Sequence, residues 1–243
     1  QLTPGHPTSY GQGLCDMYFL AGDEESVPVG QPYLRMGAGY LKRPAKPWDF
    51  MKTYTLLPLD VSWQADNRSV RFVTQAWPCG GFGYWQEKTL LVEDNRLTTT
   101  VNLKNTGEKE MKIQTFNHNF LTLGSFETDE KTHLELPAFC QLGQQVADGT
   151  PILLENGELR WPKVPGGWFM CTEEHPASAE PLAYAWRLWR EDSALSVRES
   201  DDFAPVKAMV WGKRHVVSPE MYTAFTLAPG EGHAWTRTWT FDD

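Results

Sequence analysis

The sequence predicts an all-β protein, folded as a large antiparallel β-sandwich. No long segment carries apolar residues at helical spacing, and short alternating runs bounded by Gly, Pro, Asn and Asp recur along the chain. The composition supports a substantial core, since 41% of the 243 residues are hydrophobic and 13% are aromatic. Neither a linker nor an internal repeat is evident. We therefore expect one domain over residues 1–243, with a loop-rich start over residues 1–45.

The middle of the chain gives the clearest strands. Residues 50–77 are typical of a strand, a turn at Asp66-Asn67 and a second strand, and the turns "EDN" and "KNTGE" then separate three more. In the strand from Leu97 to Leu103, leucine, threonine and valine occupy one face, while two threonines and an asparagine occupy the other. That alternation is typical of a half-buried strand.

The rest of the chain repeats the same pattern to its end. Short apolar runs from residue 133 onward are each bounded by turn residues, and "ENGE" at 155–158 has the composition of a tight hairpin. Strands at this spacing favour an antiparallel sandwich.

Charge and motifs exclude several function classes. The net charge is −9 without a basic stripe, which argues against nucleic-acid binding, and no apolar run reaches the length of a membrane span. The Cys and His spacings match no metal-ligand pattern, and no nucleotide fingerprint occurs, so we expect neither metal nor cofactor. An acidic chain with 11 tryptophans suits a neutral polyhydroxylated partner, a monosaccharide or glycan. The oligomeric state is not predicted.

The first residue is Gln1 rather than Met, which we interpret as a trimmed N-terminus. The sequence does not fix the compartment, although an extracytoplasmic location is favoured slightly over a cytoplasmic one.

A polar cluster marks the end of the strand that starts at Met111. Asn117, His118 and Asn119 stand side by side among apolar residues, where each side chain needs hydrogen-bond partners. Alternation puts His118 on the same face as two phenylalanines and both asparagines on the other face. A histidine in this setting suits general acid catalysis. A buried histidine bonded to backbone is the alternative, and the pattern alone leaves both open.

Two segments carry a family resemblance. "LTTTVNLKNTGEKEMKIQTFNHNFL" resembles the galactose mutarotase (aldose 1-epimerase) superfamily, in which an "NH.YF"-like element follows such a strand. "SPEMYTAFTLAPGEGHAWTRTWTF" resembles the strands that close that domain, and "YLRMGAGYLKRP" resembles a stretch found in divergent relatives. The resemblance implies a β-supersandwich with a sugar cleft and an isomerase that interconverts sugar anomers. One acid protonates the ring oxygen, one base accepts the anomeric proton, and the ring opens and recloses without a metal.

The resemblance assigns the acid to His118. The family's glutamate base has no counterpart at its usual place, and Glu220 is the nearest carboxylate, either as the base or as a cap of a turn after Pro219. The family's second histidine is also missing, because the corresponding region reads "AWPCGGFGYWQEK". The expected sugar contacts are Asn117, Asn119 and Arg71, an aromatic platform of Trp77, Tyr84 and Trp85, and His215 in place of the missing histidine.

Two alternatives share the fold. The missing glutamate and histidine favour a non-catalytic sugar-binding module. An epimerase or lyase acting on a uronic acid would instead need a cation for the substrate carboxylate, with Arg35, Lys42, Arg43 or Arg214 as candidates.

Overall fold

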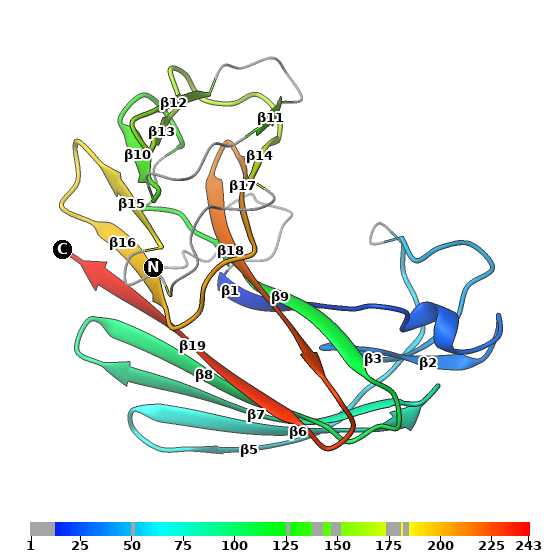
Figure 1. Ribbon diagram of the computed structural model, residues 1–243. Coiled ribbons are helices and arrows are strands. Elements are labelled where there is room, and N and C mark those ends of the chain that lie inside the picture. The colour runs from blue at the N-terminus through cyan, green and yellow to red at the C-terminus, as the bar shows by residue number, and fades with distance from the viewer. Residues whose placement is uncertain are drawn as a thin grey trace.

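The computed structural model describes residues 13–49, 52–124, 127–137, 143–146, 152–173, 181 and 185–243. Over these residues the chain forms three sheets, and every strand pairing within them is antiparallel (Figure 1). The all-β antiparallel fold class is therefore confirmed. Within the described residues, no helix is long and apolar enough to cross a membrane.

The largest sheet has ten strands and winds from the top of the view in Figure 1 to the bottom. Its order is β12-β13-β10-β15-β16-β19-β8-β7-β6-β5, with β5 at an edge. The bounds are β5 (Asp60–Ala65), β6 (Ser69–Cys79), β7 (Phe82–Glu93), β8 (Arg96–Asn105), β10 (Thr132–Glu135), β12 (Leu153–Glu155), β13 (Glu158–Arg160), β15 (Trp186–Arg190), β16 (Ser196–Asp201) and β19 (Gly232–Asp242).

The second sheet has six strands in the order β1-β9-β18-β17-β14-β11. Strand β9, from the "TFNHNF" segment, lies between β1 and β18, second from the edge that β1 forms. The bounds are β1 (Gly13–Leu20), β9 (Met111–Phe120), β11 (Gly143–Val146), β14 (Phe169–Glu173), β17 (Lys207–Lys213) and β18 (Val216–Leu227).

A small third sheet lies beside these two, at the right of Figure 1. It consists of β2 (Pro32–Arg35), β3 (Gly39–Lys42) and β4 (Leu56–Leu57), and the short 3-10 helix η1 (Glu24–Ser26) precedes it.

Turn chemistry explains why the predicted hairpins form where they do. The β7–β8 turn contains Asp94 at φ 51°, and the β12–β13 turn contains Asn156 at φ 53° followed by Gly157 at φ 81°. Asn, Asp and Gly are the residues that tolerate positive φ in tight hairpins. The predicted turns at "EDN" and "ENGE" are thereby confirmed.

The inner faces of the two large sheets form the core. Trp161, Trp186 and Trp239 are completely buried there, so much of the tryptophan content serves packing. In β8, Thr99, Val101 and Leu103 are buried while Asn102 is exposed, which confirms the alternation predicted for that strand.

Two segments differ from the sequence-based expectation. The loop-rich start contains an eight-residue strand, β1, which pairs with β9 along its whole length. Glu220 follows Pro219 inside β18 rather than in a turn, because Pro219 pairs across to Val210 of β17 within a continuous strand.

Candidate functional site

The ladder between β9 and β18 is interrupted in its middle. It runs from Met111 to Thr115 on β9, and a single bridge from Leu121 to Val217 continues the same register beyond the gap. Pro219 has no N–H to donate inside the gap. Side chains bind the carbonyls left over there: Asn119 Nδ2 donates to Pro219 O over 2.6 Å, and Arg237 Nη2 donates to Met221 O over 2.8 Å.

His118 faces Glu220 directly across this gap. The shared register also sets Phe116 opposite Tyr222 on the same face, and those two rings stack with centroids 4.2 Å apart. Because side chains alternate along a strand, this outer face of the six-stranded sheet presents His118 and Phe120 together. Cys15 of β1 is the register partner of His118 on the other side.

A compact hydrogen-bond network fixes the imidazole of His118. Its Nδ1 lies 2.5 Å from Glu220 Oε1 and 2.7 Å from Ser218 Oγ. Ser218 Oγ donates to the same Oε1 over 2.7 Å, and the Tyr222 hydroxyl donates to Oε2 over 3.2 Å. The Glu220 side chain is completely buried, whereas 23% of the His118 side chain is exposed.

These contacts assign the tautomer of His118. Ser218 donates its only hydroxyl proton to Glu220, so its oxygen can only accept from His118. Nδ1 of His118 therefore carries the hydrogen, which it shares between Ser218 Oγ and Glu220 Oε1. The other nitrogen, Nε2, forms no hydrogen bond to a described residue and is the one that can meet a ligand.

Aromatic side chains surround the imidazole. The Phe120 ring lies 3.9 Å from that of His118 between centroids, and the Trp211 ring meets it edge-on at 5.7 Å. Phe19 extends the group by stacking on Phe116 at 6.0 Å, and 41% of Phe19 is exposed. This aromatic face can pack against the C–H face of a pyranose.

The structure does not bring Asn117 and Asn119 to this face. Both are buried on the opposite side of β9, because alternation turns them toward the ten-stranded sheet. Asn117 Nδ2 donates to Asp16 Oδ1 over 3.0 Å, and Asn119 Nδ2 donates to Glu199 Oε2 over 2.9 Å. Asn117 thus binds the neighbouring strand of its own sheet and Asn119 links the two large sheets, so neither side chain contacts a ligand over His118.

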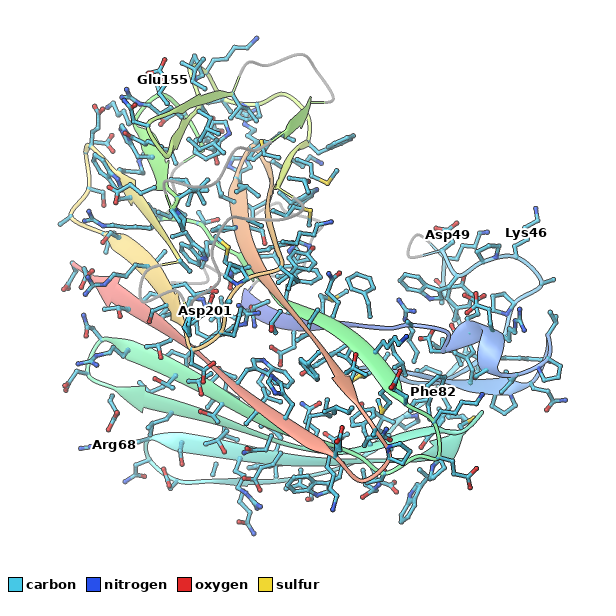
Figure 2. The ribbon with its side chains drawn as sticks, in the orientation of Figure 1. Lys46, Asp49, Arg68, Phe82, Glu155 and Asp201 are labelled. Atoms are coloured by element: carbon cyan, nitrogen blue, oxygen red, sulfur yellow. The ribbon has the colours of Figure 1, made fainter. Side chains whose placement is uncertain are left out.

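A buried ion cluster lies on that inner side. Arg237 Nη1 donates to Glu199 Oε1 over 3.0 Å and to Asp201 Oδ1 over 3.3 Å. Figure 2 labels Asp201 near the centre of the molecule. Burial, and then repulsion from Glu199, raise the pKa of Asp201 well above its usual value, and burial also raises the pKa of Glu199. Arg237 is the shared counter-ion, and burial and the two acids act on its pKa in opposite directions, with a net rise.

Arg71 also lies away from His118. It forms an ion pair with Glu87 on the face of β6 and β7 that points out of the sandwich. Lys88, the next residue along β7, points inward and pairs with Asp16 of β1. Strand alternation therefore puts Arg71 on the wrong side of the ten-stranded sheet for a role beside His118.

The predicted aromatic platform is not assembled. Tyr84 is buried in the core, where its hydroxyl accepts a hydrogen bond from Gly37 N over 3.2 Å. Trp77 is 61% exposed and donates through Nε1 to Asp60 over 2.8 Å. Trp85 follows Tyr84 on β7 and so points to the opposite face. The three rings therefore do not form one surface.

His215 lies in the turn between β17 and β18. Its Nε2 is 3.8 Å from Glu127 Oε1, and Arg214 donates to the same carboxylate over 2.7 Å. Of the cations considered for a uronic acid, Arg35 pairs with Asp23 and Arg43 donates to Val27 O, so both are engaged elsewhere. Lys42 ends β3 and is exposed.

The described residues contain no group of three His, Cys, Asp or Glu side chains that could hold a metal ion. Several members of the site were not predicted from the sequence: Ser218, Tyr222, Trp211 and Phe19. Ser218 and Tyr222 alternate with Glu220 in "SPEMY", which would place all three on one face of a strand. That inference requires knowing that the segment is a strand.

Comparison with solved structures shows that the fold is a galactose mutarotase-like β-sandwich. No protein-family model matches the chain, and no curated protein matches it. Solved structures do match. A galactose mutarotase-like protein from Clostridium acetobutylicum has a TM-score of 0.59 at 11% identity, covering 95% of this chain and 79% of that one.

Two further structures give the same result. A galactose mutarotase related enzyme from Lactobacillus acidophilus has a TM-score of 0.54 at 12% identity, covering 77% of this chain and 72% of that one. The Slr1438 protein from Synechocystis sp. PCC 6803 has a TM-score of 0.57 at 10% identity; 76% of this chain matches 66% of that chain, just under two thirds of its length. The likeness is one of fold, and it confirms the fold class and the resemblance predicted from the sequence.

Proposed function

We propose that this chain is a carbohydrate-active protein of the aldose 1-epimerase type, with the sugar bound over His118 on the outer face of the six-stranded sheet. The observation that carries the proposal is the contact of His118 Nδ1 with the buried Glu220 and Ser218, which leaves Nε2 available for a ligand beside the Phe120 ring. The fold shared with a galactose mutarotase related enzyme supports the same assignment.

In this proposal Glu220 is not the base that the resemblance implies. At 2.5 Å from His118 Nδ1, its carboxylate leaves no room for a sugar ring between the two residues. Glu220 therefore acts through His118 as a positioning residue and stabilises the imidazolium, instead of taking a proton from the far side of the sugar.

One imidazole can carry both proton transfers. Nε2 of His118 accepts the proton of the anomeric hydroxyl while the bond between C1 and the ring oxygen breaks, and the ring oxygen leaves as a hydroxyl by taking a proton back from the imidazolium. Rotation about C1–C2 and the reverse sequence then give the other anomer. Both sugar oxygens are bonded to C1, so one nitrogen can reach them in turn.

Polarimetry on freshly dissolved α-D-glucose and α-D-galactose tests the proposal. We expect the wild type to accelerate mutarotation and His118→Asn to lose about 10²-fold or more of that acceleration, the usual size of a general acid–base contribution. His233→Asn is the matched control, because His233 packs against Phe225, whose register partner on β9 is Ile113 rather than His118. No acceleration by the wild type, or full acceleration by His118→Asn, would contradict the assignment.

Glu220→Gln separates positioning from a purely structural role. It keeps the shape of the side chain and removes the charge behind Nδ1. We expect a lower kcat with a nearly unchanged KM and a displaced pH–rate profile, whereas a folding defect would lower the active fraction without moving the profile.

A non-catalytic sugar-binding module is the second candidate. The observation that favours it is the same short contact between His118 and Glu220. Because of that contact Glu220 cannot act on the opposite side of a sugar ring, so one proton-transfer group remains where the mechanism implied by the family uses two. Saturable sugar binding by the wild type without any change in mutarotation rate would select this candidate.

A further inference from the structure

Strand β5 forms a free edge of the ten-stranded sheet, at the bottom of the view in Figure 1. It pairs with β6 on one side, and no strand of the described residues pairs with its other side. All six of its residues, Asp60–Ala65, are exposed to solvent. An exposed edge of this kind offers its backbone to a further strand, and native proteins usually protect such edges.

The hairpin register shows which backbone groups of β5 point to the free side. Asp66 N donates to Ser69 O over 3.0 Å, so Asp66 directs its backbone groups toward β6. Bonded and non-bonded positions alternate along an antiparallel pair. Counting back along β5 from Asp66, the N–H and C=O groups that point away from β6 are those of Val61, Trp63 and Ala65. These are the groups that a further strand could bind.

The sequence of β5 lacks the devices that block edge pairing. "DVSWQA" contains no Lys, Arg, Pro or Gly, and it pairs with β6 in one continuous register without a bulge. Asp60 is its only charged residue, and Trp77 Nε1 already donates to that carboxylate. The opposite edge of the same sheet is protected by its shortness, because β12 has only three residues.

Two large apolar side chains project from this edge. Val61 is 55% exposed and Trp63 is 66% exposed. Strand alternation puts both on one face of the sheet, and it puts Asp60, Ser62 and Gln64 on the other. The edge therefore combines free backbone groups, an exposed apolar face and an exposed polar face, which are the features of a surface that pairs with another strand.

The order of these side chains makes β5 complementary to a second copy of itself. When two β5 strands lie antiparallel about a two-fold axis through Ser62, Val61 of each copy lies opposite Trp63 of the other. Aromatic and β-branched residues are favourable cross-strand pairs. The same register sets the free backbone groups of the two copies against each other. On the polar face, Asp60 lies opposite the amide of Gln64, which can donate to the carboxylate.

Charge favours this register over its neighbour. A register with Trp63 on the axis also joins the free backbone groups, but it sets Asp60 opposite Asp66 of the second copy, so two acids meet at each end. Registers centred closer to either end of β5 overlap fewer residues of each strand. Because the chain carries a net charge of −9, a contact between two copies is favoured where few acids face each other.

From these observations we propose that β5 is an interface at which two copies of this chain join edge to edge, with Ser62 on the two-fold axis. Backbone hydrogen bonds of Val61 and Trp63 continue the ten-stranded sheet of one copy into that of the other. The side chains of these two residues cover each other across the interface. The proposal does not depend on the function proposed for the His118 face, which belongs to the other large sheet.

Sedimentation equilibrium over a concentration series tests the interface. We expect the mass of the wild type to approach twice the 27.6 kDa of one chain. Trp63→Lys should raise the dissociation constant by about tenfold or more, because the axis brings the two ammonium groups close together. Phe241→Lys is the matched control and should leave the dissociation constant unchanged, since Phe241 is also exposed but lies on β19, with three strands between it and β5.

A disulfide tests the register. Ser62 occupies a non-bonded position of the interface, where paired Cα atoms lie about 4.5 Å apart, within the span of a disulfide. Under oxidised glutathione, Ser62→Cys should form a covalent dimer whose linkage at residue 62 is identified by peptide mass spectrometry. Gln64→Cys, also exposed and on the same face, should not. A monomer at every concentration, an unchanged dissociation constant in Trp63→Lys, or no linkage at residue 62 refutes the proposal.

Discussion

Replacing Arg237 by Met should destabilise the protein more than almost any other single substitution. The side chain is 2% exposed and binds three acceptors at once: Glu199, Asp201 and Met221 O. Methionine fills much of the same volume but pairs with none of them. Breaking a buried ion pair costs about 3–5 kcal/mol and orphaning a buried carbonyl costs about 1–3 kcal/mol. Partial protonation of the acid pair offsets part of the sum, so we expect a loss of about 4–6 kcal/mol.

Urea unfolding at neutral pH, followed by tryptophan fluorescence, measures this loss. With a slope of about 3 kcal/mol/M, the midpoint should fall by about 1.3–2 M. Arg198→Met is the matched control on the neighbouring strand, since that side chain is 52% exposed and lies 3.9 Å from Asp242; its effect should stay below about 1 kcal/mol. If Arg237→Met cost no more than this control, the argument that Arg237 neutralises the buried acids would be refuted.

Two further predictions concern the core. Because the pKa values of Glu199 and Asp201 are raised on folding, the native state binds more protons than the unfolded state above their ordinary values of 4.5 and 3.8. The pair's contribution to stability is therefore complete below that range and declines as pH rises through the native pKa values; urea midpoints from pH 4 to 8 should fall less steeply with pH in Asp201→Asn than in the wild type, and parallel profiles would contradict the assignment. Gly212→Ala should cost about 1–3 kcal/mol, because the added Cβ would lie 2.2 Å from Phe169 Cζ and 2.6 Å from Val216 O, and an unchanged melting temperature would show that this contact relaxes freely.

The hairpin turns and the strand alternation were predictable from the sequence because neighbouring residues determine them. The hairpin turns at Asp94 and Asn156 follow from positive-φ chemistry, and the alternation in β8 follows from one buried face. Strand β1 was harder, since "GLCDMYFL" has Gly- and Pro-rich neighbours and its pairing with β9 spans nearly a hundred residues. Local composition does not report such distant pairing.

The candidate site was predictable only in part. The motif placed His118 and the spacing suggested Glu220, and the structure brings their side chains into contact. The sequence alone could not predict what the strand register decides. Register puts Glu220 opposite His118, turns Asn117 and Asn119 toward the core, and brings the rings of Phe120 and Trp211 close to His118. Each depends on which strand lies beside β9, a long-range property.

In the gap of the β9–β18 ladder, side-chain contacts replace backbone pairing as what holds the two strands at their distance. Backbone pairing on either side of the gap sets the architecture and tolerates many sequences, whereas inside the gap the spacing of the strands depends on Asn119 and Arg237. A substitution at Asn119 should therefore alter the distance between His118 and Glu220, whereas a substitution at Arg237 also removes the counter-ion of the buried acids. The gap is therefore the place where side chains, rather than the backbone ladder, set the geometry of the candidate site.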